Sequence, residues 1–128
     1  MADLPKPTEA ELEILQILWE KEPCTVRQVN EVLSQKKKTG YTTTLKFMQI
    51  MLEKGLLKRE EAGRSHIYSS AVAEADTQQR LLDRFVNQVF KGSASKLVMQ
   101  ALGNKKSSKD ELEQIRKLLD EIDNADNE

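Results

Sequence analysis

The first quarter of the chain alternates apolar and polar residues with the period of amphipathic helices. Thr8 with Glu11 forms the S/T-x-x-E pattern that begins a helix, and apolar residues recur at helical spacing until Pro23 ends it. Thr25 with Gln28 repeats this capping pattern ahead of a second, shorter apolar stripe. The pattern therefore predicts two helices that follow each other closely.

A third helix is predicted after the polar linker QKKKTG, from about Thr42 to Lys54. Its apolar residues fall on one face, and Gly55 supplies the left-handed position that often ends a helix. The segment LLKREEAGRSHIYSS then shows two short extended runs around Ala62 and Gly63. These runs predict a β-hairpin.

The second half of the chain has the pattern of helices alone. Apolar stripes occupy residues 74–90, residues 97–102 and a last helix that Ser108 caps, and the acidic tail DNADNE is expected to fray. No sheet pattern accompanies these stripes to cover them, so a second copy of the chain is the simplest partner. The residues expected to form this dimer contact are Leu82, Phe85, Val86, Val89, Leu97, Leu102, Leu112, Ile115 and Leu119.

Three helices followed by a hairpin are the order of elements in a winged helix-turn-helix, whose third helix enters the DNA major groove. The expected fold is therefore mainly α-helical with a small β-hairpin. We predict a winged-helix domain over residues 1–72, with the wing at residues 57–68, and a helical dimerisation region over residues 73–128.

The outward face of the third helix begins with Thr42, Thr43 and Lys46. Hydroxyls and a lysine at a helix N-terminus suit phosphates and base edges. The alternative is that Thr42 is the N-cap of the helix and that the threonines next to it have no function of their own. Arg64, at the hairpin tip, is expected to reach phosphate or a minor groove. The residues predicted to contact DNA are Lys38, Tyr41, Thr42, Thr43, Thr44, Lys46, Phe47, Gln49, Ile50 and Arg64.

Positive charge is concentrated in the middle of the chain, although the net charge is only −1. Residues 25–70 hold nine basic and four acidic side chains, net +5, between a segment of net −4 and one of net −2. A basic segment between acidic ones suits a polyanionic partner. The alternative is a solvated surface whose charge is simply uneven.

Nothing in the sequence suggests an enzyme. His66 is the single histidine and Cys24 the single cysteine, and no catalytic set, metal-ligand cluster or Gly-rich phosphate loop accompanies them. We expect His66 on the hairpin surface, Cys24 and Trp19 in the core, and no cofactor or metal. Without an apolar run near roughly 18 residues, we expect a cytoplasmic protein that does not insert into membranes.

The segments TEAELEILQILWEK, YTTTLKFMQIMLEKGLL and EEAGRSHIY together resemble the penicillinase-repressor (BlaI/MecI/CopY) family. The resemblance implies a dimeric bacterial transcriptional repressor on an inverted-repeat operator, often with TGTA/TACA half-sites. Base and phosphate contacts would then fall on Thr42, Thr43 and Lys46, with Arg64 serving the wing. The alternative function is a winged helix that binds protein without specific DNA binding.

Three features depart from the pattern of that family. Ile50 stands where many members carry a basic residue, and the cysteine pair of the copper-responsive branch is absent, so copper sensing is not expected. Gln100-Ala101 replaces the Asn-Phe bond at which the penicillin-responsive branch is cleaved. Relief of repression by a membrane sensor protease is therefore an open alternative.

Overall fold

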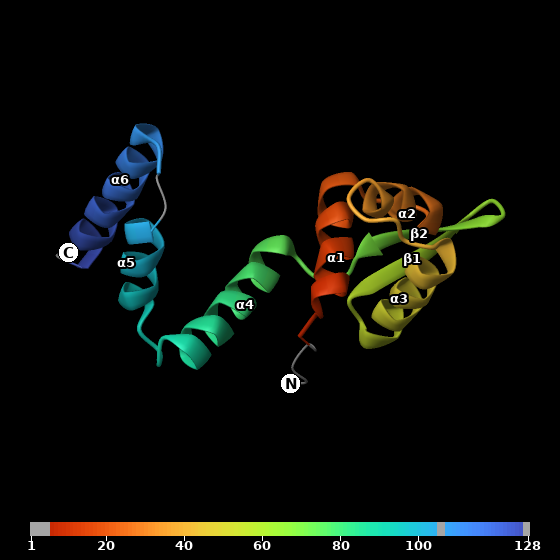
Figure 1. Ribbon diagram of the computed structural model, residues 1–128, viewed down its shortest axis with the longest axis horizontal. Helices are drawn as coiled ribbons and strands as arrows, with labels where there is room; N and C mark the ends of the chain where they lie inside the picture. The colour runs from red at the N-terminus through yellow and green to blue at the C-terminus, as the bar shows by residue number, and fades with distance from the viewer. Residues whose placement is uncertain (1–5, 105–106, 127–128) are drawn as a thin grey trace. The chain divides into compact units, whose positions relative to one another are not determined.

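A computed structural model describes residues 6–104 and 107–126 (Figure 1). The helices and strands of this part of the chain agree with the predicted order, so the expected fold class, mainly α-helical with one antiparallel hairpin, is confirmed. None of the described helices is both long enough and apolar enough to cross a bilayer. The elements are α1 (Glu9–Lys21), α2 (Val26–Ser34), α3 (Tyr41–Lys54), β1 (Leu57–Ala62), β2 (Ser65–Ser70), α4 (Glu74–Val89), α5 (Ala94–Asn104) and α6 (Lys109–Asp126).

The chain divides into two compact units, residues 1–82 and residues 83–128, with the division inside α4. The first unit contains the three N-terminal helices and the hairpin, and the second contains the end of α4 with α5 and α6. The functional boundary at residues 72 and 73 stays a prediction.

Both predicted capping boxes begin a helix. At α1, the Glu11 N–H donates to Thr8 Oγ1 (3.2 Å) and the Thr8 N–H donates to Glu11 Oε1 (3.0 Å). At α2, the Gln28 N–H donates to Thr25 Oγ1 (3.2 Å) and the Thr25 N–H to Gln28 Oε1 (2.8 Å). Each box satisfies donors that an isolated helix start leaves without partners, which fixes where the two helices begin.

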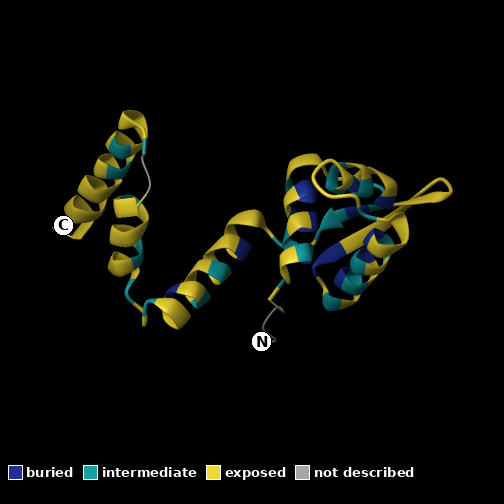
Figure 2. Cartoon of the chain, in the orientation of Figure 1, coloured by how far each residue is buried: buried dark blue, intermediate teal, exposed yellow. Residues whose placement is uncertain are grey.

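The core of the first unit lies where α1, α2 and α3 meet the hairpin (Figure 2). Leu15, Leu18, Val29, Met48 and Met51 have essentially no exposed surface. They come from the apolar stripes that the sequence pattern identified, so burying those stripes holds the three helices together.

Tyr68 joins the hairpin to this core. Its side chain is 2% exposed, and its backbone forms an antiparallel bridge with Cys24 through two hydrogen bonds, Cys24 N to Tyr68 O (3.0 Å) and Tyr68 N to Cys24 O (2.7 Å). Cys24 is buried as predicted, and burial raises the pKa of its thiol. Trp19, partly buried against the core, donates from Nε1 to Ser70 Oγ (2.9 Å) and to Val72 O (3.0 Å). These contacts hold β2 and the segment after it against α1.

The hairpin turns through two residues. Ala62 pairs with Ser65 in the antiparallel register, which leaves Gly63 and Arg64 at the tip. Gly63 has φ +66°, a backbone conformation that glycine adopts without steric cost. Gly55 has φ +84° and ends α3 as predicted. Arg64 therefore stands at the end of a short ribbon, exposed to solvent.

The second unit is built from helices with exposed apolar side chains. Phe85 and Phe90 contact each other, with ring centroids 5.9 Å apart. Ser108 Oγ accepts the N–H of Glu111 (3.1 Å), so the predicted cap of α6 is confirmed. The prediction that the acidic tail frays is wrong for the residues described, because α6 continues to Asp126. Residues 127 and 128 lie outside the described part of the chain.

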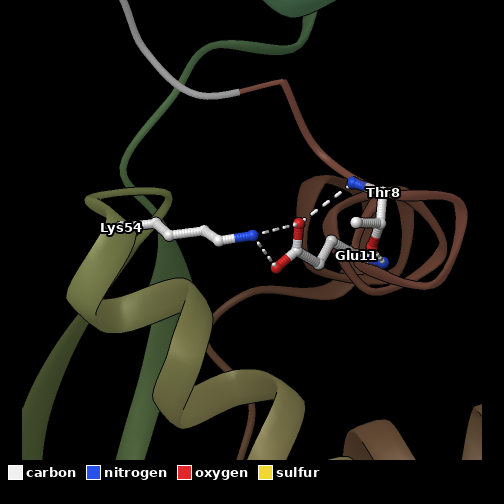
Figure 3. A network of polar contacts seen from close by, with 3 residues as sticks. All are labelled: Thr8, Glu11 and Lys54. Atoms are coloured by element: carbon white, nitrogen blue, oxygen red, sulfur yellow. Dashed lines mark hydrogen bonds and ion pairs between the residues drawn. The ribbon is translucent and has the colours of Figure 1, made fainter.

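A buried carboxylate connects the start of α1 to the end of α3 (Figure 3). Glu11 is only 2% exposed, and its Oε2 and Oε1 accept hydrogen bonds from Lys54 Nζ at 2.9 Å and 3.1 Å. Burial acts to raise the pKa of Glu11, but the hydrogen bond from the Thr8 backbone and the pairing with Lys54 outweigh it, so the pKa is below its usual value. Sequence reasoning assigned Glu11 only a capping role.

We expect Lys54→Met to lower the free energy of unfolding by about 2 kcal/mol, because it leaves a buried carboxylate without its cation. Fully buried pairs lose roughly 3–5 kcal/mol, and the loss here is smaller because Lys54 is 34% exposed. Urea unfolding at pH 7 measures it. Lys58→Met, at an exposed lysine of β1, is the matched control and should change little. Equal losses in the two variants would contradict a structural role for the Glu11–Lys54 pair.

The same pair predicts acid sensitivity. Because the folded-state pKa of Glu11 is lowered from 4.5, its contribution to stability is present above pH 4.5 and is lost as the pH falls through the folded-state pKa. Glu11→Gln should therefore flatten the decline in stability of the wild-type chain on acidification. Urea unfolding at several pH values between 3 and 7 measures the slopes; parallel slopes would count against this assignment.

Candidate nucleic-acid interface

The N-terminus of α3 lacks a side-chain cap. Gly40 is the N-cap residue and provides no side-chain hydrogen bond. The helix begins at Tyr41, one residue before the predicted start, so the alternative that Thr42 is the N-cap is wrong. The first backbone N–H groups of a helix have no intrahelical partners and carry a partial positive charge. This helix start is therefore suited to an anionic ligand.

The three consecutive threonines occupy two different environments. Thr42 and Thr43 are exposed, whereas Thr44 has no exposed surface. The Thr44 hydroxyl donates to Asn30 Oδ1 of α2 at 2.8 Å. The prediction that Thr44 contacts DNA is therefore wrong, because its hydroxyl is buried and holds α3 against α2.

The outward face of α3 carries most of the predicted contact residues. Lys46 and Gln49 are exposed, and Tyr41 is 48% exposed at the helix start. Phe47 and Ile50 are half-buried, and Phe47 also packs against the core. The helix thus presents hydroxyls and a lysine to solvent, but its outward face is not purely polar.

A groove of about 560 Å³ separates the start of α2 and the start of α3 from the hairpin. Two of the predicted residues, Tyr41 and Arg64, lie on its walls. Arg27 and Gln28 of α2 line the same groove, as does the exposed His66. Sequence reasoning missed Arg27 and Gln28 as interface residues, although the capping box of Gln28 marked the helix start that faces this groove.

Lys38 lies in a different hollow, of about 450 Å³, between the α2–α3 linker and α1. Lys37 and Lys38 share its lining with Thr43 of α3 and with Glu9 and Glu13 of α1. Two carboxylates in the lining weaken the attraction of this hollow for phosphate. The structure therefore does not bring Lys38 together with Arg64, and the groove beside the hairpin is the more favourable anion site.

Basic side chains at the groove and on α3 are available to a ligand. Arg27, Lys46 and Arg64 take no part in the ion pairs of Glu11 with Lys54 and of Glu113 with Arg116. In the same part of the chain, no cluster of three His, Cys, Asp or Glu side chains is arranged to hold a metal ion. The chemistry of this surface is electrostatic attraction and hydrogen bonding, as phosphate contacts require.

The penicillinase repressor family model matches residues 7–121. The chain belongs to this family. Two relatives align over nearly the full length. One is the methicillin resistance regulatory protein MecI of Staphylococcus aureus strain N315, 27% identical over 112 residues, which cover 88% of this chain and 91% of the relative. The other is the penicillinase repressor of Bacillus licheniformis, 24% identical over 128 residues, which cover all of both chains.

Solved structures agree with this membership of the penicillinase repressor family. The DNA-binding domain of the repressor BlaI aligns with a TM-score of 0.52 at 25% identity, over 59% of this chain and 93% of that chain. The monomeric form of Bacillus licheniformis BlaI in complex with the blaP half-operator aligns with a TM-score of 0.51, at the same identity and coverage. The predicted winged-helix fold is therefore confirmed.

The two environments of the threonines predict unequal effects of the same substitution. Thr44→Val should lower the free energy of unfolding by about 1 kcal/mol, because it removes the hydrogen bond of a buried hydroxyl and leaves the partly buried Asn30 amide oxygen without this donor. Thr43→Val is the matched control, and as an exposed change it should cost no more than about 0.5 kcal/mol. Urea unfolding compares the two; a larger loss for Thr43→Val would contradict the assigned roles.

Proposed function

We propose that the chain is a DNA-binding transcriptional repressor and not an enzyme. The observation that carries this proposal is the uncapped α3 N-terminus, where Tyr41 lines a groove together with Arg27 of α2 and Arg64 of the hairpin tip. Lys46 is exposed on the outward face of the same helix. The chain belongs to the penicillinase repressor family, and one aligned structure is that of BlaI with a half-operator. Repression would follow from occupying promoter DNA.

The docking mode follows from the geometry of the winged helix. The N-terminal half of α3 enters the major groove, where Thr42, Thr43 and Lys46 contact base edges and phosphates. The hairpin lies along the flanking backbone or minor groove through Arg64. Arg27, at the start of α2, contacts the phosphate between these two elements. The basic segment of net +5 at residues 25–70 supports this assignment.

We further propose that the chain acts as a homodimer on an inverted repeat. In the second unit, several large apolar side chains stay exposed in a single chain, which favours burial against a second copy. Val86 is only 8% exposed, so the structure leaves it little surface for this contact. The predicted dimer residues with the most exposed surface are Leu82, Phe85, Val89 and Leu119.

A repressor acts on the chromosome, so we propose that the protein is located in the cytoplasm.

A membrane sensor protease stays a candidate partner. Gln100 and Ala101, which replace the family's cleaved bond, are exposed but lie within α5. Cleavage there would require α5 to open, because proteases bind their substrates in extended form.

The competing function, a protein-binding winged helix, differs in its dependence on salt. DNA binding through several phosphates weakens steeply as salt rises. An apolar protein contact responds little. Flat salt dependence would therefore favour the protein-binding alternative.

We expect Lys46→Ala to weaken binding to an inverted-repeat duplex about fivefold at low salt and to reduce the salt slope by about 0.9, because one phosphate contact is lost. Fluorescence anisotropy with a labelled duplex carrying TGTA and TACA half-sites measures both values. Lys21→Ala, at an exposed lysine that ends α1, is the matched control and should leave both unchanged. A parallel loss of thermal stability in Lys46→Ala would argue against a DNA role.

We expect deletion of residues 74–128 to give a folded monomer with much weaker duplex binding. The truncated chain keeps the core cluster and Val72, whose carbonyl accepts the Trp19 hydrogen bond. Losing the dimer contact removes the second half-site from the same binding event. Analytical ultracentrifugation measures the association state, and a dimer persisting without residues 74–128 would contradict the assignment of the dimerisation region.

A further inference from the structure

The outward face of α3 contains a shallow depression whose polar rim takes part in the docking mode above but whose apolar residues, Phe47 and Ile50, have no role in it. It has a volume of about 390 Å³, and its lining surface is mostly apolar. We call it the α3 depression; the residues that line it are Thr42, Thr43, Lys46, Phe47 and Ile50.

Helical spacing explains the position of the α3 depression. Thr43, Phe47 and Ile50 are spaced i, i+4 and i+7, so they form one stripe along the helix. Thr42 and Lys46 form the neighbouring stripe, and both are exposed. Phe47 and Ile50 are half-buried, so their apolar atoms form the floor while the hydroxyls and the ammonium group surround it.

We propose that the α3 depression receives the 5-methyl group of a thymine and makes Ile50 a specificity-determining residue. This inference rests on the proposed function, because the depression lies on the face of α3 assigned to the major groove. Thymine is the one base whose major-groove edge carries an apolar group. The edges of adenine, guanine and cytosine present polar groups there, and each loses hydrogen bonds to water against an apolar floor.

The surrounding polar groups place the base. Lys46 and the α3 N-terminus attract the backbone phosphates, which brings base edges within reach of Ile50. Ile50 stands where many members of the family carry a basic residue. Its contribution is instead the removal of one methyl group from water, an energy that depends on contact and not on charge. Discrimination at this position should therefore persist at high salt.

The test replaces thymine by deoxyuridine, which lacks only the methyl group. The parent duplex is selected from a random library by the full-length wild-type chain, so no operator sequence is assumed. Each thymine is then replaced in turn, in both half-sites together, and affinity is measured by anisotropy. We expect at least one replacement to weaken wild-type binding by about fourfold per methyl group. In Ile50→Ala the same replacement should have almost no effect.

Arg64→Ala provides the control. It should weaken binding to both duplexes but keep the wild-type ratio of affinities for thymine and deoxyuridine, because the hairpin tip does not line the α3 depression. The inference is overturned if no replacement changes wild-type affinity for the selected duplex, or if Ile50→Ala keeps the wild-type ratio. If selection yields no duplex, the proposed function fails as well, and the two failures are thereby distinguished.

Discussion

The orientation of α3 depends on two polar contacts, one near each of its ends, and each contact has one partner that is buried. Near the start, the Thr44 hydroxyl donates to Asn30 of α2. At the other end, Lys54 pairs with Glu11 of α1, which is almost fully buried. A buried carboxylate without a partner is strongly destabilising, so only a narrow range of helix positions keeps both contacts. Apolar packing alone would allow α3 to slide or rotate, since it is not directional.

This constraint lets one helix serve two purposes. Thr44, Met48 and Met51 lie on the buried face, whereas Thr43 and Lys46 lie on the exposed one. Each of the three threonines lowers helix propensity slightly, because β-branched side chains lose rotamer freedom in a helix. The hydrogen bond of Thr44 offsets part of that loss, and the exposed threonines place hydroxyls beside the uncapped helix start. The run of threonines is therefore a compromise between folding and surface chemistry.

Local signals were readable in the sequence, and contacts between distant segments were not. The capping boxes, the glycine that ends α3 and the hairpin tip involve residues within a few positions of each other, so pattern and spacing identified them. Glu11 satisfies the capping box and also pairs with a lysine 43 positions away, and the local pattern conceals that second role. The burial of Thr44 was missed for the same reason, because the hydroxyl partner lies on another helix.

The residues of the candidate interface divide in the same way, into those that local patterns identified and those that contacts between distant segments bring in. The exposed residues of α3 and the hairpin tip were found from helical periodicity and turn chemistry. Arg27 joins the groove only because the bridge between Cys24 and Tyr68 brings the hairpin beside the start of α2. Periodicity also placed Ile50 on the outward face. The α3 depression, however, depends on Phe47, which packs against the core and also lines the depression. How much of Phe47 stays exposed is set by packing in three dimensions, which the pattern of residues along the sequence does not contain.

The two units differ in how they bury apolar surface, and this difference connects folding to association. The first unit has a core that excludes water without help, whereas α5 and α6 contain no buried residue among those described. Helices without a single buried residue gain little stability from packing within one chain, and most of the stability of a helix in a protein comes from packing of its apolar face. Their stability must therefore come from the surface that covers their apolar stripes. If that surface is a second copy, folding of these helices and pairing of the chains are one event, and both depend on protein concentration.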